Sequence, residues 1–129
     1  MITQKYLDEL TFNVIGAAIE VHKNMGSGLL ESVYQQCMIE ELTNRNINFV
    51  SEFKVPVVYK GKELDIEFRC DLFVENCLVV ELKSVSEIKP IHDAQVLNYM
   101  NLLKVPKGII INFNCFNLCF YVVKPISKS

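Results

Sequence analysis

The sequence lacks several features that define common classes of protein. Its 129 residues contain no apolar run near the ~18 residues that a membrane-spanning helix needs. The N-terminal residues 1–5 carry no apolar segment followed by a cleavage site, so no signal peptide is expected. We therefore expect a cytoplasmic protein that does not bind membranes.

Cysteines and basic residues are also too few, or wrongly spaced, for several functions. The five cysteines are an odd number in mostly apolar surroundings, which predicts reduced thiols. Cys115 and Cys119 have no second pair at zinc spacing, and no four cysteines have iron–sulfur spacing. A formal net charge of −2 argues against coating nucleic acid through bulk charge. A local basic rim is still available from Lys54, Lys60, Lys62, Lys83, Lys89, Lys104 and Lys107.

The remaining composition is that of one globular domain over residues 1–129. Half of the residues are hydrophobic and 22% are charged, and no repeat, low-complexity stretch or linker interrupts the chain. Apolar periodicity and turn residues predict helices at 6–23, 29–44 and 90–103, and strands at 49–53, 55–59, 64–71, 72–74, 78–80, 109–113 and 118–123. A short tail is expected at 125–129. This order predicts an α/β fold, a mixed β-sheet flanked by helices.

The sequence also predicts a turn, a fully buried strand and the buried face of the third helix. A tight hairpin turn is expected at 60–62. The β-branched run that begins at Ile109 predicts a strand buried on both faces, as in parallel pairing. The third helix begins at Pro90, and its buried face should carry Ile91, Ala94, Leu97, Met100 and Leu102 or Leu103.

The hairpin within residues 71–83 has the most informative pattern. A three-residue loop at 75–77 places Asp71 opposite Glu81, and opposed residues share a face with Cβ atoms about 5 Å apart. Lys83 follows two residues after Glu81 and lies on the same face. The opposite face then takes Cys70, Leu72, Val80 and Leu82.

Two opposed carboxylates repel each other unless a positive charge lies between them. A hard divalent cation such as Mg²⁺ suits Asp71 and Glu81, with Lys83 beside it. The alternative is a surface salt bridge between Lys83 and one of the two acids. A two-residue loop would also separate the carboxylates onto opposite faces of the sheet.

Two helices carry further polar residues that could have either a structural role or a role in the site. Glu31 lies in the first turn of the second helix, where the dipole alone favours a carboxylate. Gln95 and Tyr99 are four residues apart on one helical face, and both need hydrogen-bond partners if buried. Tyr34, three residues after Glu31, is expected in the core with its hydroxyl directed towards the site.

These patterns together resemble a known group of enzymes. Asp71, Glu81 and Lys83 resemble the D…E-x-K core of the PD-(D/E)XK nuclease superfamily. Gln95 and Tyr99 resemble the Q-x-x-x-Y motif of its RecB-like branch, and Gly28, Glu31 and Tyr34 match the signature of the small GxxExxY protein family.

This resemblance implies a restriction-endonuclease-like core, αβββαβ, with an extra N-terminal helix. It also implies a Mg²⁺- or Mn²⁺-dependent phosphodiesterase that acts on DNA or RNA. In that reading Asp71, Glu81 and the carbonyl of Leu82 bind the metal, and Glu31 contributes through water. The other residues with catalytic roles are Lys83, Gln95 and Tyr99.

Two alternatives stay open at the level of sequence. The chain could be a non-catalytic module that binds nucleic acid or protein on a nuclease-like scaffold. The apolar final strand could be a sheet edge that pairs with a second copy to form a homodimer, or it could be covered.

Overall fold

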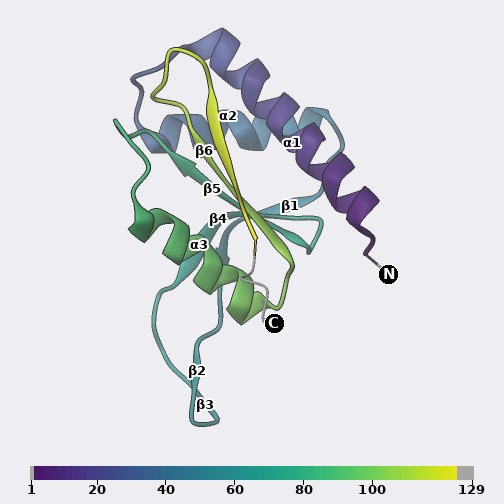
Figure 1. Cartoon of the computed structure of the whole chain (residues 1–129), viewed down its shortest axis with the longest axis vertical. Coiled ribbons are helices and arrows are strands. Elements are labelled where there is room, and N and C mark those ends of the chain that lie inside the picture. The colour runs from purple at the N-terminus through teal and green to yellow at the C-terminus, as the bar shows by residue number, and fades with distance from the viewer. Residues whose placement is uncertain (1, 125–129) are drawn as a thin grey trace.

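The computed structural model describes residues 2–124 (Figure 1). Its elements are α1 (Gln4–Met25), α2 (Glu31–Asn44), β1 (Phe49–Lys54), β2 (Val58–Tyr59), β3 (Lys62–Glu63), β4 (Arg69–Val74), β5 (Leu78–Lys83), α3 (Pro90–Leu103), β6 (Lys107–Asn112) and β7 (Cys119–Val123). The tail expected at 125–129 lies outside the described residues.

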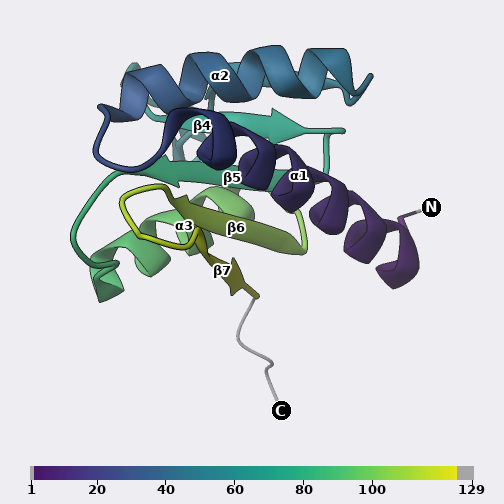
Figure 2. The same ribbon diagram turned by 90° about the horizontal axis from the view of Figure 1, so that it is seen from above.

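Five strands form one mixed sheet in the order β1-β4-β5-β6-β7, and β2 and β3 form a separate two-stranded ribbon. Helices α1 and α2 cover one face of the sheet, and α3 covers the other (Figures 1 and 2). Each face has its own cluster of buried residues, one containing side chains of α1 and α2 and one containing side chains of α3. This arrangement confirms the predicted α/β class and the restriction-endonuclease-like core.

The register of the central strands agrees with the sequence analysis. Val74 pairs with Leu78, so the loop between β4 and β5 has the three residues expected. Glu75 and Asn76 in this loop have positive φ angles of 50° and 57°. β6 runs parallel to β5 after the α3 crossover and is buried along its whole length, as the β-branched run predicts.

The strand expected over 64–71 is wrong in its first half, because β4 begins only at Arg69. Ile66, within the expected strand, is 45% exposed. The last backbone hydrogen bond that continues the β1–β4 pairing runs from Val55 N–H to the Phe68 carbonyl. Pro56 follows and has no N–H to continue the ladder. Residues 56–68 instead leave the sheet and form the β2–β3 arm, with the tight turn at 60–62 as predicted.

The buried face of α3 also differs from the prediction. Ile91 is 68% exposed and Ala94 is exposed, whereas Val96 and Tyr99 are buried. Met100 is buried as predicted, and Leu97 and Leu103 pack against the same cluster. α3 approaches the sheet over Gly108 of β6. A Cβ atom on Gly108 would lie 2.6 Å from Val96 Cγ1 and 2.9 Å from Met100 Sδ. The bare backbone at this glycine therefore allows Val96 and Met100 to pack closely against the sheet.

This contact makes Gly108→Ala a test of the packing of α3. The added methyl group would collide with two buried side chains, and overpacking of this kind costs about 1 to 3 kcal/mol of unfolding free energy. Gly16→Ala within α1 is the matched control, because its added methyl group meets only the flexible end of Arg45 at 3.3 Å. That control should be neutral or more stable by up to about 1 kcal/mol. Urea unfolding of both variants measures the difference, and an unchanged midpoint for Gly108→Ala would contradict the packing described.

Candidate functional site

The site begins where β4 and β5 separate. Pairing between these strands extends to Leu72 and Val80. Beyond that point β4 continues along β1 as far as the Lys54–Arg69 pair, and β5 continues along β6 as far as the Lys83–Asn112 pair. The next residues on the two separating strands are Asp71 and Glu81. Their side chains therefore lie at the opening between the strands.

The two carboxylates bridge this opening by reciprocal hydrogen bonds. The N–H of Asp71 donates to Glu81 Oε1 at 2.8 Å, and the N–H of Leu82 donates to Asp71 Oδ2 at 2.8 Å. One oxygen of each carboxylate, Asp71 Oδ1 and Glu81 Oε2, makes no hydrogen bond to the described residues. Within residues 2–124 no buried side-chain nitrogen or oxygen lacks a hydrogen-bond partner, so neither oxygen is completely enclosed, although Glu81 as a residue is only 3% exposed.

Burial makes the charged form of this pair unfavourable. Burial first, and the charge of Asp71 second, raise the pKa of Glu81 to about 8. Burial raises the pKa of Asp71 to about 6, although the hydrogen bond from Leu82 N–H acts in the opposite direction. Lys83 Nζ is the nearby cation, 3.9 Å from Glu81 Oε2, with a side chain only 14% exposed. One ammonium at this distance does not neutralise the two acids, and the pair is suited to bind a cation.

Helix α2 contributes Glu31 at its first position, close enough that its charge raises the pKa of both Asp71 and Glu81. Among residues 2–124 no three Asp, Glu, His or Cys side chains form a group that could hold a metal ion. Glu31 therefore lies near the pair but does not complete a three-carboxylate centre.

The segment before α2 is shaped by the tyrosine of the same motif. Gly28 has a φ of +91°, which an L-residue rarely adopts. The hydroxyl of Tyr34 donates to the Gly26 carbonyl at 2.6 Å and accepts from the Leu29 N–H at 3.2 Å. Ser84, directly after β5, donates from Oγ to the Leu29 carbonyl at 2.6 Å. Tyr34 is buried in the core, as expected, and its hydroxyl bonds to the backbone of the loop that leads to Glu31.

Gln35 is a contact that the sequence analysis missed. Its Nε2 donates to the carbonyl of Asp71 at 3.1 Å and to Glu52 Oε1 at 3.0 Å. Its position one helical turn after Glu31 was the available signal, because residues four apart share a helical face. Gln35 thus ties α2 to the backbone of the residue that carries one of the carboxylates.

Helix α3 holds the start of β4 from the other face. The hydroxyl of Tyr99 donates to the Arg69 carbonyl at 2.7 Å and accepts from Gln95 Nε2 at 3.1 Å. The Tyr99 ring packs against Phe68 with centroids 4.6 Å apart. Burial, followed by the charge of Glu81, raises the pKa of Tyr99. The structure thus brings Gln95 and Tyr99 together and directs them to the strand that carries Asp71.

One residue of the hairpin lies on an unexpected face. Cys70 was placed with Leu72, but it packs in the α3 cluster while Leu72 packs in the α1 and α2 cluster. The neighbouring strand β1 changes in the same way, since Phe49 packs with the first cluster and Phe53 with the second. Between them Glu52 has a φ of 50°. This local turn of the strand pair explains why simple alternation fails there.

A family model described as the PD-(D/E)XK nuclease superfamily matches residues 8–121. The chain belongs to this superfamily. The matched region contains the separating strands β4 and β5 and the polar residues of α2 and α3 described above.

Comparison with solved structures supports the same fold. The crystal structure of SSO0001 matches with a TM-score of 0.57 and 21% sequence identity, over 74% of this chain and 52% of that one. The chain therefore spans about half the length of SSO0001, and the likeness concerns the fold. No curated protein matches the sequence. No helix among residues 2–124 is long and apolar enough to cross a membrane.

The raised pKa values predict how stability depends on pH without metal. An acid whose pKa is higher in the folded state binds more protons when folded, so stability falls as pH rises between its unfolded and folded pKa values. For Glu81 this interval runs from 4.5 to about 8. The unfolding free energy in EDTA should therefore fall between pH 5 and 8, roughly by a few kcal/mol.

Glu81→Gln should remove most of this fall, because an amide cannot ionise. Urea unfolding at several pH values measures it, with the exposed Glu9→Gln as the control. An unfolding free energy of the wild type that rises between pH 5 and 8 would show that burial does not raise the pKa values of the carboxylate pair.

Proposed function

We propose that the protein is a Mg²⁺- or Mn²⁺-dependent nuclease that hydrolyses phosphodiester bonds in DNA or RNA. The observation that carries the proposal is the bridged carboxylate pair, in which Asp71 and Glu81 each keep one oxygen that makes no hydrogen bond to the described residues. Both acids have raised pKa values, and among residues 2–124 the one cation within 4 Å of either is Lys83. Membership of the nuclease superfamily supports the same activity.

The donor set fits a hard divalent ion. Carboxylate and carbonyl oxygens are the ligands that Mg²⁺ prefers, and Mg²⁺ usually keeps several waters, so few protein ligands are enough. We assign these ligands to Asp71, Glu81 and the carbonyl of Leu82, with Glu31 acting through water. When bound, the ion polarises the phosphate and lowers the pKa of its bound water.

The other residues hold or orient the reacting groups. Lys83 lies beside Glu81 with its side chain 14% exposed, where it would orient the attacking water and stabilise charge that develops on the phosphate. Tyr99 fixes the start of β4 through the Arg69 carbonyl. Gln95, half-buried beside Tyr99, is placed to position the phosphate backbone.

Two finer assignments belong to the same proposal. We place the chain in the GxxExxY family, because Gly28 and Tyr34 form the loop that leads to Glu31 at the site. We place it near the RecB-like branch because Gln95 and Tyr99 act as one hydrogen-bonded pair next to Asp71.

The edge of the sheet supports a homodimer as the assembly. β7 is an edge strand, and its Phe120, Tyr121 and Val122 are 45%, 44% and 44% exposed. An apolar edge of this kind pairs readily with another strand, and a second copy of β7 would supply one.

The first experiment is titration of Mn²⁺ into the wild type and Asp71→Asn by calorimetry. The amide can still accept the hydrogen bond from Leu82 N–H, so the variant should fold but lose one ligand charge. We expect at least about a tenfold loss of Mn²⁺ affinity, equivalent to about 1.4 kcal/mol.

The same two proteins and Lys83→Ala should then be incubated with labelled single- and double-stranded DNA and RNA. We expect cleavage by the wild type alone, with a loss of about 10²-fold or more in both variants. Metal binding without cleavage of any substrate would favour a binding module on a nuclease-like scaffold. Equal Mn²⁺ affinity of the wild type and Asp71→Asn would overturn the metal site.

A further inference from the structure

The β2–β3 ribbon projects from the body of the molecule as an arm beyond α3 (Figure 1). At its tip Tyr59 pairs with Lys62 around the turn, and the Tyr59 side chain is 62% exposed. None of residues 58–63 belongs to either buried cluster. An isolated two-stranded hairpin is only marginally stable in water. The tip therefore contributes little to folding, and its exposed groups are free to contact a partner.

The arm carries charges of both signs, and its two lysines lie at the turn. Lys60 and Lys62 flank Gly61 at the tip, and neither forms an ion pair with the described residues. Lys60 Nζ lies 5.5 Å from the centre of the Tyr59 ring, a cation–π contact that keeps the aromatic and basic groups together. Glu63 follows Lys62 directly in β3, and Asp65 and Glu67 lie nearer the base, where Glu67 pairs with Arg69 at 2.7 Å. The turn itself, residues 59–62, carries two lysines and one tyrosine and no acidic side chain.

The arm is joined directly to the candidate site. Its base is the Lys54–Arg69 pair, and Asp71 follows two residues after Arg69. Lys60 precedes Arg69 by nine residues. An extended strand of that length reaches at most about 30 Å, a distance that spans about nine phosphates of one strand of B-form DNA.

We propose that the tip of this arm binds the phosphate backbone of the same nucleic acid whose scissile phosphate lies at Asp71 and Glu81. This inference rests on the proposed function and adds a second contact several nucleotides away. Lys60 and Lys62 supply point charges for two phosphates, and Tyr59 supplies an aromatic face for a base or sugar. Lys107 in β6 also belongs to the expected rim. It is excluded as a phosphate contact, because it is 6% exposed and bonded to Asp8.

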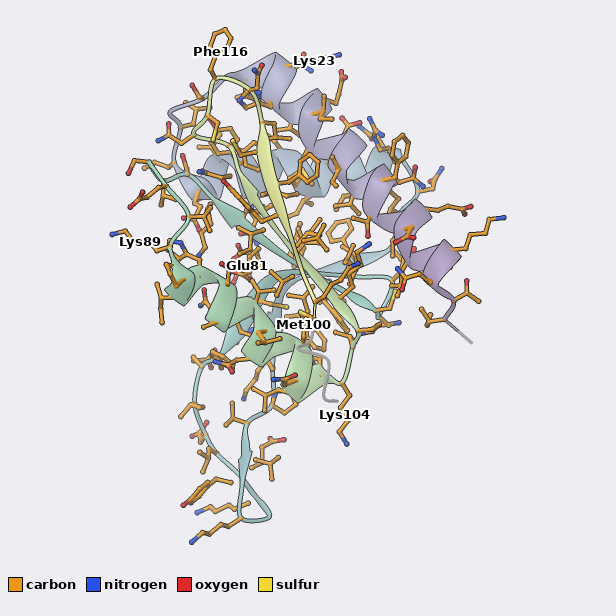
Figure 3. All side chains as sticks on the ribbon, in the orientation of Figure 1. Lys23, Glu81, Lys89, Met100, Lys104 and Phe116 are labelled. Atoms are coloured by element: carbon orange, nitrogen blue, oxygen red, sulfur yellow. The ribbon has the colours of Figure 1, made fainter. Side chains whose placement is uncertain are left out.

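The test is the salt dependence of binding, measured by fluorescence anisotropy in EDTA with single- and double-stranded DNA of about 30 nucleotides. Replacing both lysines (Lys60→Ala with Lys62→Ala) should reduce the slope of log K against log salt by about 1.4 for single strands and about 1.8 for duplex. The control replaces Lys5 and Lys23 by Ala on α1, and Figure 3 shows Lys23 at the end of the molecule opposite the arm. Its slope should equal that of the wild type. Replacing Lys60 and Lys62 by Arg should preserve the slope.

Substrate length provides a second readout. With a dinucleotide, whose single phosphate can occupy only one of the two contacts, the difference between wild type and the Lys60/Lys62 variant should largely disappear. Equal slopes on the long DNA, or an equal loss in the α1 control, would overturn the arm contact.

The outcome also separates this inference from the nuclease proposal. A reduced slope in a protein that cleaves nothing supports the arm on a binding scaffold and counts against the nuclease. Cleavage with unchanged slopes supports the nuclease proposal and rules out the arm contact. A wild type that binds no nucleic acid rules out both proposals.

Discussion

The candidate site depends on the reciprocal hydrogen bonds that join β4 and β5 where their ladder stops. The buried N–H groups of Asp71 and Leu82 need acceptors, since unpaired backbone groups are costly. The side chains of Glu81 and Asp71 provide them. Both carboxylates are thus fixed by the backbone before any ion binds. The same arrangement buries two like charges, which raises both pKa values. The fold accepts this destabilisation at one place, as is common at functional sites.

The rest of the structure supports this opening from both faces of the sheet. On one face, Gln35 of α2 holds the Asp71 carbonyl. On the other, Tyr99 of α3 holds the Arg69 carbonyl. α3 is kept close to the sheet because β6 has no side chain at Gly108. The start of β4 is therefore held by both helices that cover it, so the distance between its carboxylate and that of β5 is set by packed elements and not by loops.

Much of this could be predicted from the sequence because it depends on local rules. The three-residue loop determines which residues of β4 and β5 face each other, and the β-branched run of β6 signals burial on both faces. Other features depend on distant contacts. The change of face at Cys70 follows from the positive φ of Glu52 on another strand. The buried stripe of α3 depends on its close contact with Gly108, and the sequence signal for Gln35, its position one turn after Glu31, does not reveal its bond to the Asp71 carbonyl.

Net charge is a weak guide to nucleic-acid binding, because it sums charged groups that lie in different parts of the molecule. The formal value of −2 counts Asp71 and Glu81 as fully ionised, whereas burial raises the pKa of both. A bound divalent ion would offset that formal charge at the site itself. The basic groups that remain exposed are distributed over the surface, and two lie together at the tip of the arm. Attraction to a polyanion then depends on where these charges stand relative to the site, and an acidic chain can still present a positive contact to nucleic acid.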